Sequence, residues 1–246
     1  MGSTSDLGTG VRCVLPNSNI ERSEIENCFW QDNRPGFSSL LFKMGASSLA
    51  FIPLRKAIIV EGATDMLLLP TIFRQVSQRT SLGFQIAPGL SVAPKSILSL
   101  LENEAPSVVF LTDNDAAGKE LAKQLKEAGI EESRILHLPG VEGTVLEDCI
   151  NKELYLEAIN NEFLNWNQNP PIMSLKDLPD INRPKALSKW CKANSIKPPD
   201  KKVIAYRLLD FATGEQPKIL IPSDMKEAFK ELHEKITHEL SLQQQD

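Results

Sequence analysis

Residues 56–65 read KAIIVEGATD, and this stretch decides the fold class that the sequence predicts. It opens with a short, uninterrupted apolar run, which is typical of a strand buried on both faces of a parallel sheet. Gly62 permits a sharp turn after the strand, and Thr64 and Asp65 suit the cap and first turn of a helix. Glu61 is therefore predicted at the carboxyl end of a central strand, where open α/β sheets bind their ligands.

A second acidic segment follows another apolar run. Residues 107–111 are apolar after the first position, and residues 112–119 then read TDNDAAGK. Asp113 and Asp115 are two positions apart, so on an extended chain both side chains point to the same side. With Glu61 they would crowd one sheet edge, and like charges that close raise one another's pKa unless a cation compensates. Because carboxylate oxygens without nearby His or Cys suit Mg²⁺ or Mn²⁺, the sequence predicts a metal site there.

The chain around these segments alternates between strand and helix patterns. Strands are predicted at 57–60, 83–87, 107–111 and 134–138, and helices at 64–79, 94–103 and 116–128, with two more between 144 and 163. Such alternation implies a mainly parallel sheet with right-handed crossovers. The predicted fold class is α/β, a Rossmann-like domain with a mainly parallel four-stranded sheet, followed by a helical lobe.

Three regions are predicted along the chain. Residues 1–55 form an N-terminal segment, with a strand at Val11–Leu15 and a short helical pattern at Ile20–Trp30; the tail of an ATPase region is an alternative reading. The α/β domain spans residues 56–165, and a helical basic lobe spans residues 166–246 after an Asn- and Pro-rich linker. The helices expected in this lobe are 184–194, 203–211 and 223–240.

Composition bounds the class of protein. The chain is 41% hydrophobic and 24% charged, which is ordinary for a globular protein. No apolar run approaches the length of a membrane span, and the first residues lack the pattern of a signal peptide. The four cysteines are far apart without a Cys-x-x-Cys pair, which argues against a zinc site or disulfide framework and favours a reducing cytoplasm.

Basic residues concentrate in one part of a chain whose net charge is −5. Residues 183–202 carry seven lysines and arginines against a single acid, Asp200. A positive surface beside an acidic metal centre suits a phosphodiester backbone; a solvated helix face is the alternative. The lysines predicted to bind DNA are Lys185, Lys189, Lys192, Lys197 and Lys202.

Two motifs together resemble a known domain. A strand ending in Glu-Gly-x-x-Asp, followed by a strand ending in Asp-x-Asp-x-Ala-Gly, looks like the TOPRIM domain of topoisomerases, primases and certain nucleases, over roughly residues 56–150. Thr144-Val-Leu-Glu147 is similar to the Thr-x-x-Glu segment of the OLD ("overcoming lysogenization defect") family of ATP-dependent endonucleases, which bind two metals. A capping box at the start of a helix is the alternative reading of Thr144 and Glu147.

A third segment, PPDKKVIAYRL at residues 198–208, resembles the OLD-family segment in which a lysine precedes a helix and completes the nuclease site. Matching Ala205 and Leu208 puts that lysine at Lys201. The residue after it is Lys202, where the family usually has Gly, so the match leaves room for a shift by one position.

The resemblance implies a metal-dependent DNA endonuclease that uses two Mg²⁺ or Mn²⁺ ions. The metal ligands it implies are Glu61, Asp65, Asp113, Asp115 and Glu147; the catalytic residues are Glu61, Asp113 and Lys201. For Asp65, stabilisation of a helix N-terminus by its charge is an equal alternative. Expected partners are DNA, an ABC-type ATPase domain or subunit and, as an alternative, a second copy of the chain, with no membrane.

A role in antiphage defence follows from the same resemblance. A phosphate-binding Gly-x-x-x-x-Gly-Lys-Ser/Thr loop is not found in this sequence, so the ATPase would be a separate region or subunit. A primase-like or topoisomerase-like activity is one alternative, with Tyr155 and Tyr206 as the available tyrosines. A scaffold without catalysis that binds a partner ATPase is the other.

Overall fold

The computed structural model describes residues 13–17, 22–26, 56–92, 107–166 and 169–242. The chain divides into two compact units, residues 1–53 and residues 54–246. In the first unit, β1 (Cys13–Asn17) and β2 (Arg22–Glu26) form an antiparallel pair, with Cys13 opposite Glu26. Of the strand predicted at Val11–Leu15, the described residues 13–15 lie in β1. The helical pattern predicted at Ile20–Trp30 is wrong at Arg22–Glu26, which pair as a strand; the rest of that range lies outside the described residues.

The second unit is built on a four-stranded parallel sheet in the order β4-β3-β5-β6. Its strands are β3 (Lys56–Val60), β4 (Gln85–Pro88), β5 (Ser107–Thr112) and β6 (Ile135–His137). The two central strands are buried along almost their whole length, as their uninterrupted apolar runs predict. The predicted α/β class with a parallel four-stranded sheet is therefore confirmed.

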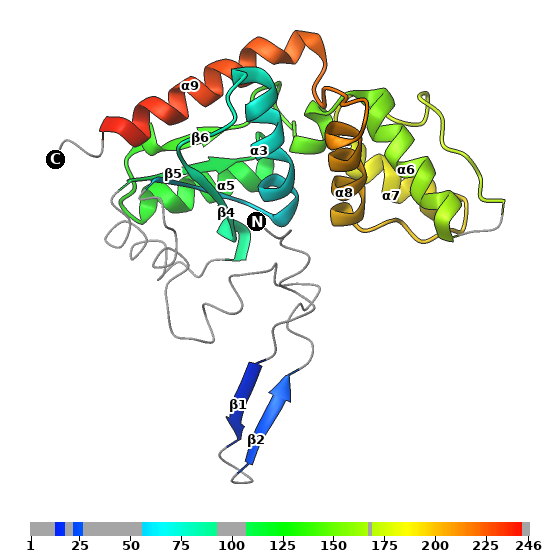
Figure 1. The fold of residues 1–246 in the computed structure, drawn as a ribbon, viewed down its shortest axis with the longest axis horizontal. Coiled ribbons are helices and arrows are strands. Elements are labelled where there is room, and N and C mark those ends of the chain that lie inside the picture. Colours follow the sequence, from blue (N-terminus) through cyan, green and yellow to red (C-terminus); the bar gives the residue numbers. More distant parts are fainter. Residues whose placement is uncertain (1–12, 18–21, 27–55, 93–106, 167–168, 243–246) are drawn as a thin grey trace. The chain divides into compact units, whose positions relative to one another are not determined.

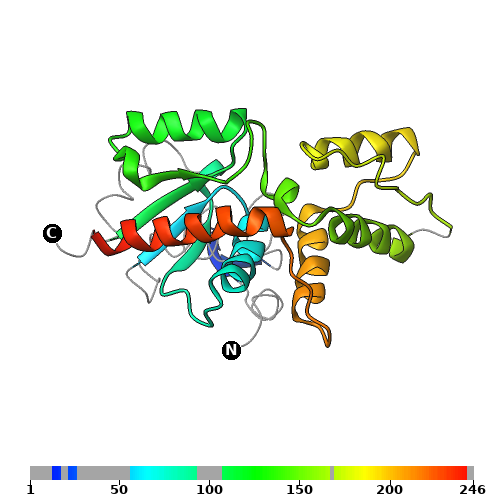
Figure 2. The ribbon, with the colours of Figure 1, turned by 90° about the horizontal axis from the view of Figure 1, so that it is seen from above.

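Helices cover both faces of this sheet. α3 (Ala63–Ser77) follows β3, and α5 (Ala116–Glu127) follows β5. Figure 2 shows α5 on one face, with α3 and the long α9 (Lys226–Leu242) on the other. α9 packs against both α3 and β5, so the last helix of the chain completes the core of the α/β part. The helix predicted at 94–103 lies outside the described residues.

The helical part comprises α6 (Lys152–Trp166), α7 (Arg183–Ala193) and α8 (Lys201–Thr213), as drawn in Figure 1. α8 packs against α3 on one side and α6 on the other. One hydrophobic core runs from the strands through these helices. The predicted boundary between residues 165 and 166 stays a prediction, while the predicted helical C-terminal part is confirmed.

Four short 3₁₀ segments connect the regular elements within the described chain: η1 (Leu90–Val92), η2 (Glu132–Arg134), η3 (Leu146–Cys149) and η4 (Ser223–Met225). η3 lies after β6 and carries Glu147, one of the acids that the sequence assigns to the metal site. Among the described residues, no helix has the length and apolar character that crossing a membrane requires.

Candidate functional site

The two central strands bring the first acidic segments together. β3 and β5 are neighbours, with Val60 opposite Leu111, so both strands end at the same sheet edge. Glu61 follows the first strand and Asp113 follows the second. The Asp113 backbone N–H donates to Oε1 of Glu61 over 2.8 Å. The sheet register therefore places these acids side by side, as the carboxyl ends of parallel strands predict.

Gly118 allows helix α5 to lie against this strand end. A Cβ atom at Gly118 would lie 2.1 Å from the carbonyl oxygen of Asp113 and 2.9 Å from Oε1 of Glu61. The Gly118 backbone N–H donates to Oδ1 of Asp115 over 2.8 Å, so Asp115 is the N-cap of α5. Aspartate is among the residues that suit an N-cap position best. Only glycine fits at position 118 without displacing the strand end.

Asp65 joins the same edge from the first turn of α3. The helix begins after Gly62, whose backbone N–H donates to Oδ2 of Asp65 over 2.9 Å. The prediction that Thr64 caps this helix is wrong, because the turn closes at Gly62 and Asp65 satisfies the free backbone donor instead. The carboxylate of Asp65 thus has a hydrogen-bond donor in the backbone of Gly62. Repulsion from Glu147 and Glu61 still acts on it and contributes to its raised pKa.

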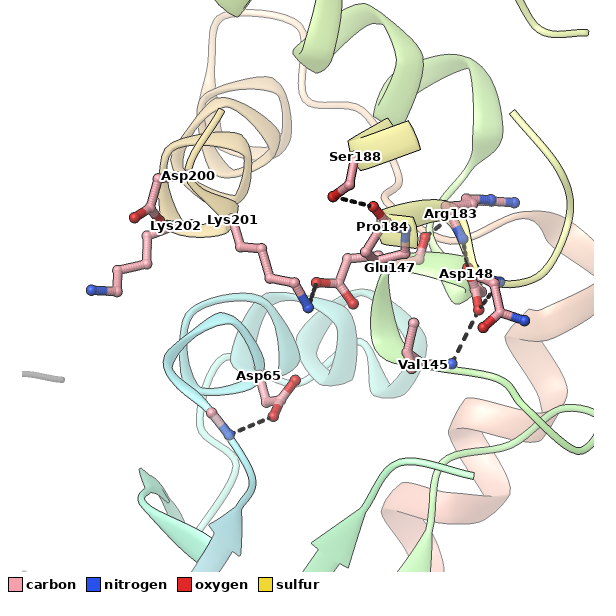
Figure 3. Close-up of polar contacts among 12 residues, drawn as sticks. Asp65, Val145, Glu147, Asp148, Arg183, Pro184, Ser188, Asp200, Lys201 and Lys202 are labelled. Atoms are coloured by element: carbon pink, nitrogen blue, oxygen red, sulfur yellow. Dashed lines mark hydrogen bonds and ion pairs between the residues drawn. The ribbon is translucent and has the colours of Figure 1, made fainter. Parts of the chain in front are cut away.

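Glu147 reaches the cluster from η3 and is bound by a lysine of α8. Its side chain is buried, and Oε1 lies 3.1 Å from Nζ of Lys201. In Figure 3 Lys201 points toward Glu147, whereas Lys202 points away. The alternative reading of Thr144 and Glu147 as a capping box is wrong, because the Val145 N–H donates to Asp148 over 3.2 Å and η3 begins at Leu146.

Burial and mutual repulsion disfavour the charged form of the acids at this sheet edge, Glu61, Asp65 and Asp113. Burial, followed by repulsion from Asp65, Glu61 and Glu147, raises the pKa of Asp113 to about 9. Burial is also the main reason that the pKa of Asp65 rises to about 7 and that the pKa of Glu61 lies above its usual value. Burial opposes the charge of Lys201, but Glu147 and the aspartates outweigh it, and the pKa of Lys201 is raised. A bound cation would relieve this repulsion.

The donor chemistry fits a hard divalent cation, because every side chain in the cluster except Lys201 supplies carboxylate oxygens. Within the described parts of the chain, no three His, Cys, Asp or Glu side chains lie close enough together to hold a metal ion as they stand. The hydrogen bonds explain this spacing: Glu61 accepts from Asp113, Asp65 from Gly62, and Glu147 pairs with Lys201. To hold a metal ion together, these carboxylates would have to turn toward one another.

The basic residues of the helical part separate into two groups. Lys185, Lys189, Lys192 and Lys197 are exposed, and Lys202 is half-buried. Arg183 is buried and donates to backbone carbonyl groups, so it belongs to the interior. Sequence patterns did not reveal this role, because its partners lie about 35 positions away.

Comparison with known proteins supports the interpretation of the sheet domain. The family model described as Toprim-like matches residues 58–144, so this part of the chain is a Toprim-like domain, as the two motifs predicted. No curated protein sequence matches the chain.

Two solved structures that match a large part of the chain are C-terminal regions of OLD proteins. The C-terminal region of the Xanthomonas campestris pv. campestris OLD protein, phased with mercury, is 18% identical, with a TM-score of 0.45, covering 75% of this chain and 97% of that one. The C-terminal region of the Burkholderia pseudomallei OLD protein is 16% identical, with a TM-score of 0.44, covering 74% and 98%.

Proposed function

We propose that this chain is a metal-dependent DNA endonuclease that hydrolyses phosphodiester bonds. The observation that supports this best is the gathering of Glu61, Asp113 and Glu147, with Lys201 paired to Glu147, at one edge of the sheet. Most of these acids lie within the Toprim-like domain. Toprim domains generally use divalent metals to act on nucleic acids, and the acid-rich edge has the charge that such ions neutralise.

The metal would be held by the carboxylates of the cluster, namely Glu61, Asp65, Asp113, Asp115 and Glu147. When bound, two Mg²⁺ or Mn²⁺ ions supply an activated water and stabilise the leaving oxygen. Lys201, paired with Glu147, would contribute a positive charge at the same place, where negative charge builds up on the phosphate during hydrolysis. In this proposal Glu61, at the strand end beside Asp113, would hold a metal ion and is placed to accept a proton from the attacking water.

DNA would reach this edge along the helical part. Lys185, Lys189 and Lys192 lie exposed on α7, at spacings of four and three residues that put them on one helix face. Lysines on one face neutralise successive phosphates without reading the bases. The substrate class is therefore a DNA backbone, with Lys197 and Lys202 as further contacts.

The proposal includes a partner that hydrolyses ATP. This sequence has no phosphate-binding Walker-type loop, so an ABC-type ATPase domain or subunit would supply that activity, and the biological role would be antiphage defence in the cytoplasm. Cys149 and Cys191 are buried free thiols, which fits a reducing compartment.

A topoisomerase-like activity is less well supported. Such an enzyme needs a nucleophilic tyrosine, but Tyr155 is 1% exposed, and burial raises its pKa above the usual value. Tyr206 is 42% exposed on α8, so a Tyr206→Phe variant separates the two functions: it retains the activity of a nuclease and abolishes that of a topoisomerase.

The test is plasmid cleavage by the full chain with Mg²⁺ and with Mn²⁺, alone and with a candidate ATPase. Asp113→Ala is expected to abolish nicking, and Lys201→Ala to lower the rate by about 100-fold, the usual cost of removing one charge-stabilising group. Lys126→Ala is the matched control, because Lys126 of the outer helix α5 forms an exposed ion pair with Glu132 of η2.

The control should nick plasmid like the wild type. A wild type that nicks no DNA under any of these conditions would contradict the proposal. Relaxation of supercoils without nicked or linear product would favour the topoisomerase, and primer synthesis from nucleotides would favour a primase. A cellular function that survives Asp113→Asn would favour a scaffold without catalysis.

A further inference from the structure

The short segment that carries Glu147 is fixed by a buried arginine from another part of the chain. Arg183, the first residue of α7, is 5% exposed. Its Nη1 donates to the carbonyl oxygens of Glu147 (3.0 Å) and Ile150 (2.5 Å), and its Nε donates to that of Pro179 (3.3 Å). Burying a guanidinium group costs free energy unless its N–H donors are hydrogen-bonded. These carbonyl groups supply acceptors for Arg183 in the protein interior.

The contact is reciprocal, because the η3 segment also holds the start of α7. Asp148 accepts the backbone N–H groups of Asn182 and Arg183, each over 2.9 Å, and of Val145 over 3.2 Å. A carboxylate at a helix N-terminus is stabilised by the free N–H groups there. Figure 3 shows Asp148 and Arg183 side by side on the far side of Glu147 from Lys201.

Glu147 is therefore held from two sides by helices of the C-terminal part. Arg183 binds its backbone carbonyl, and Lys201 binds its carboxylate. Both partners lie beyond the segment that matches the Toprim-like model. Arginine suits the backbone role because its planar fork donates to several acceptors at once, whereas lysine offers a single ammonium group.

We propose that Arg183, together with Asp148, is a positioning residue that sets the place of Glu147 in the metal centre. The inference rests on the proposed function, because it assigns Glu147 to the metal. Arg183 does not touch the metal or the DNA in this proposal; it acts through the backbone of η3. The helix that carries the DNA-binding lysines thereby also fixes one ligand of the metal.

The test measures Mn²⁺ affinity by calorimetry in the full chain. Arg183→Gln is expected to weaken binding by about tenfold or more, as is usual when the support of a metal ligand is lost. Arg183→Lys should bind Mn²⁺ more tightly than Arg183→Gln but more weakly than the wild type. In a Glu147→Gln background, Arg183→Gln should cause no further loss, because the two changes act on the same ligand. An equal loss in both backgrounds would overturn the proposal.

Arg207→Gln is the matched control for stability. Arg207 on α8 binds the buried Glu162 of α6 over 3.4 Å, so its loss should loosen the helical part without changing Mn²⁺ affinity. If Arg207→Gln weakened Mn²⁺ binding as much as Arg183→Gln, the effect would be one of general stability, and the proposal would be wrong.

A metal-free measurement separates this inference from the proposed function. Amide hydrogen exchange across residues 144–150 should accelerate at least tenfold in Arg183→Gln and remain unchanged in Arg207→Gln. A wild type that binds no Mn²⁺ would refute the proposed function, whatever the exchange rates are. A wild type that binds Mn²⁺, with exchange and affinity unchanged by Arg183→Gln, would refute the positioning role alone.

Discussion

The acidic cluster has two halves that are positioned by different means. Glu61 and Asp113 follow adjacent strands, and the backbone pairing of β3 with β5 places them. Glu147 lies on a short 3₁₀ segment, where Lys201 and Arg183 fix it from helices far along the chain. The strand half therefore depends on sheet register and close backbone packing, and the helical half depends on side chains. We expect the two halves to respond differently to mutation.

The largest effect should come from Gly118→Ala in the strand half. The added Cβ would lie 2.1 Å from the Asp113 carbonyl oxygen. Because the Cβ is bonded directly to the backbone and the oxygen is a backbone atom, no side-chain rotation can relieve this contact. The free energy of unfolding should fall by about 4 kcal/mol or more, at the upper end for single substitutions. Urea denaturation followed by circular dichroism measures it.

Gly129→Ala is the control for this change. Gly129 has φ +95°, but no neighbouring atom lies within 4 Å of the place that a Cβ would occupy. The variant therefore carries only the strain of a left-handed backbone, about 1–2 kcal/mol. Equal destabilisation by the two variants would show that crowding at the strand end does not matter.

The strand half is also the part that the sequence predicted best. The apolar runs at 57–60 and 107–111 are strands within one residue at each end, because a strand buried on both faces needs no alternation of polar residues. Local patterns did not determine that β3 and β5 are neighbours, since strand order depends on the whole sheet. The Ala-Gly at the start of α5 was visible in the motif, but its close approach to Asp113 was not.

The helical half was predicted less well, for a physical reason. Thr144 and Glu147 have the spacing of a capping box, yet the backbone donor is taken by Asp148, which also binds the N-terminus of a helix more than thirty positions away. The resemblance selected Lys201 for the nuclease site, and the structure pairs Lys201 with Glu147, while its catalytic role stays a prediction. Arg183 was counted with the basic surface, because its charge is visible in sequence and its burial is not.

An intermediate effect is expected from Asp113→Asn without metal. The pKa of Asp113 is raised to about 9. Between its unfolded pKa of about 4 and this value, the native state binds more protons than the unfolded state. The stability that protonated Asp113 contributes is therefore fully present below about pH 4 and is lost as the pH rises toward 9. At pH 8 in EDTA, the variant should therefore be more stable than the wild type.

Urea midpoints measured in EDTA from pH 5 to pH 9 check this prediction. The difference between variant and wild type should shrink as the pH falls, and Mg²⁺ should raise the midpoint of the wild type only. Asp224→Asn, which alters an exposed acid on η4, should show neither effect. A variant less stable than the wild type at pH 8 would mean that the repulsion at the strand ends is already compensated in the metal-free protein.

The smallest effect on stability, with a selective effect on DNA binding, should come from the exposed lysines of α7. Replacing Lys185, Lys189 and Lys192 by Gln should leave the urea midpoint within about 0.5 kcal/mol of the wild type, as surface changes usually do. DNA affinity should fall, and the slope of log K against log salt concentration should become shallower by about 2–3, because up to three phosphate contacts are lost.

Fluorescence anisotropy with a labelled duplex across a salt series gives both quantities. The control with the same change in net charge replaces Lys123, Lys126 and Lys235, exposed lysines of α5 and α9. If both triple variants shift the slope equally, DNA binding depends only on the net charge of the chain, and α7 has no special role. A shift confined to the α7 variant would show that the helix anchored to η3 by Arg183 is also the one that meets the DNA backbone.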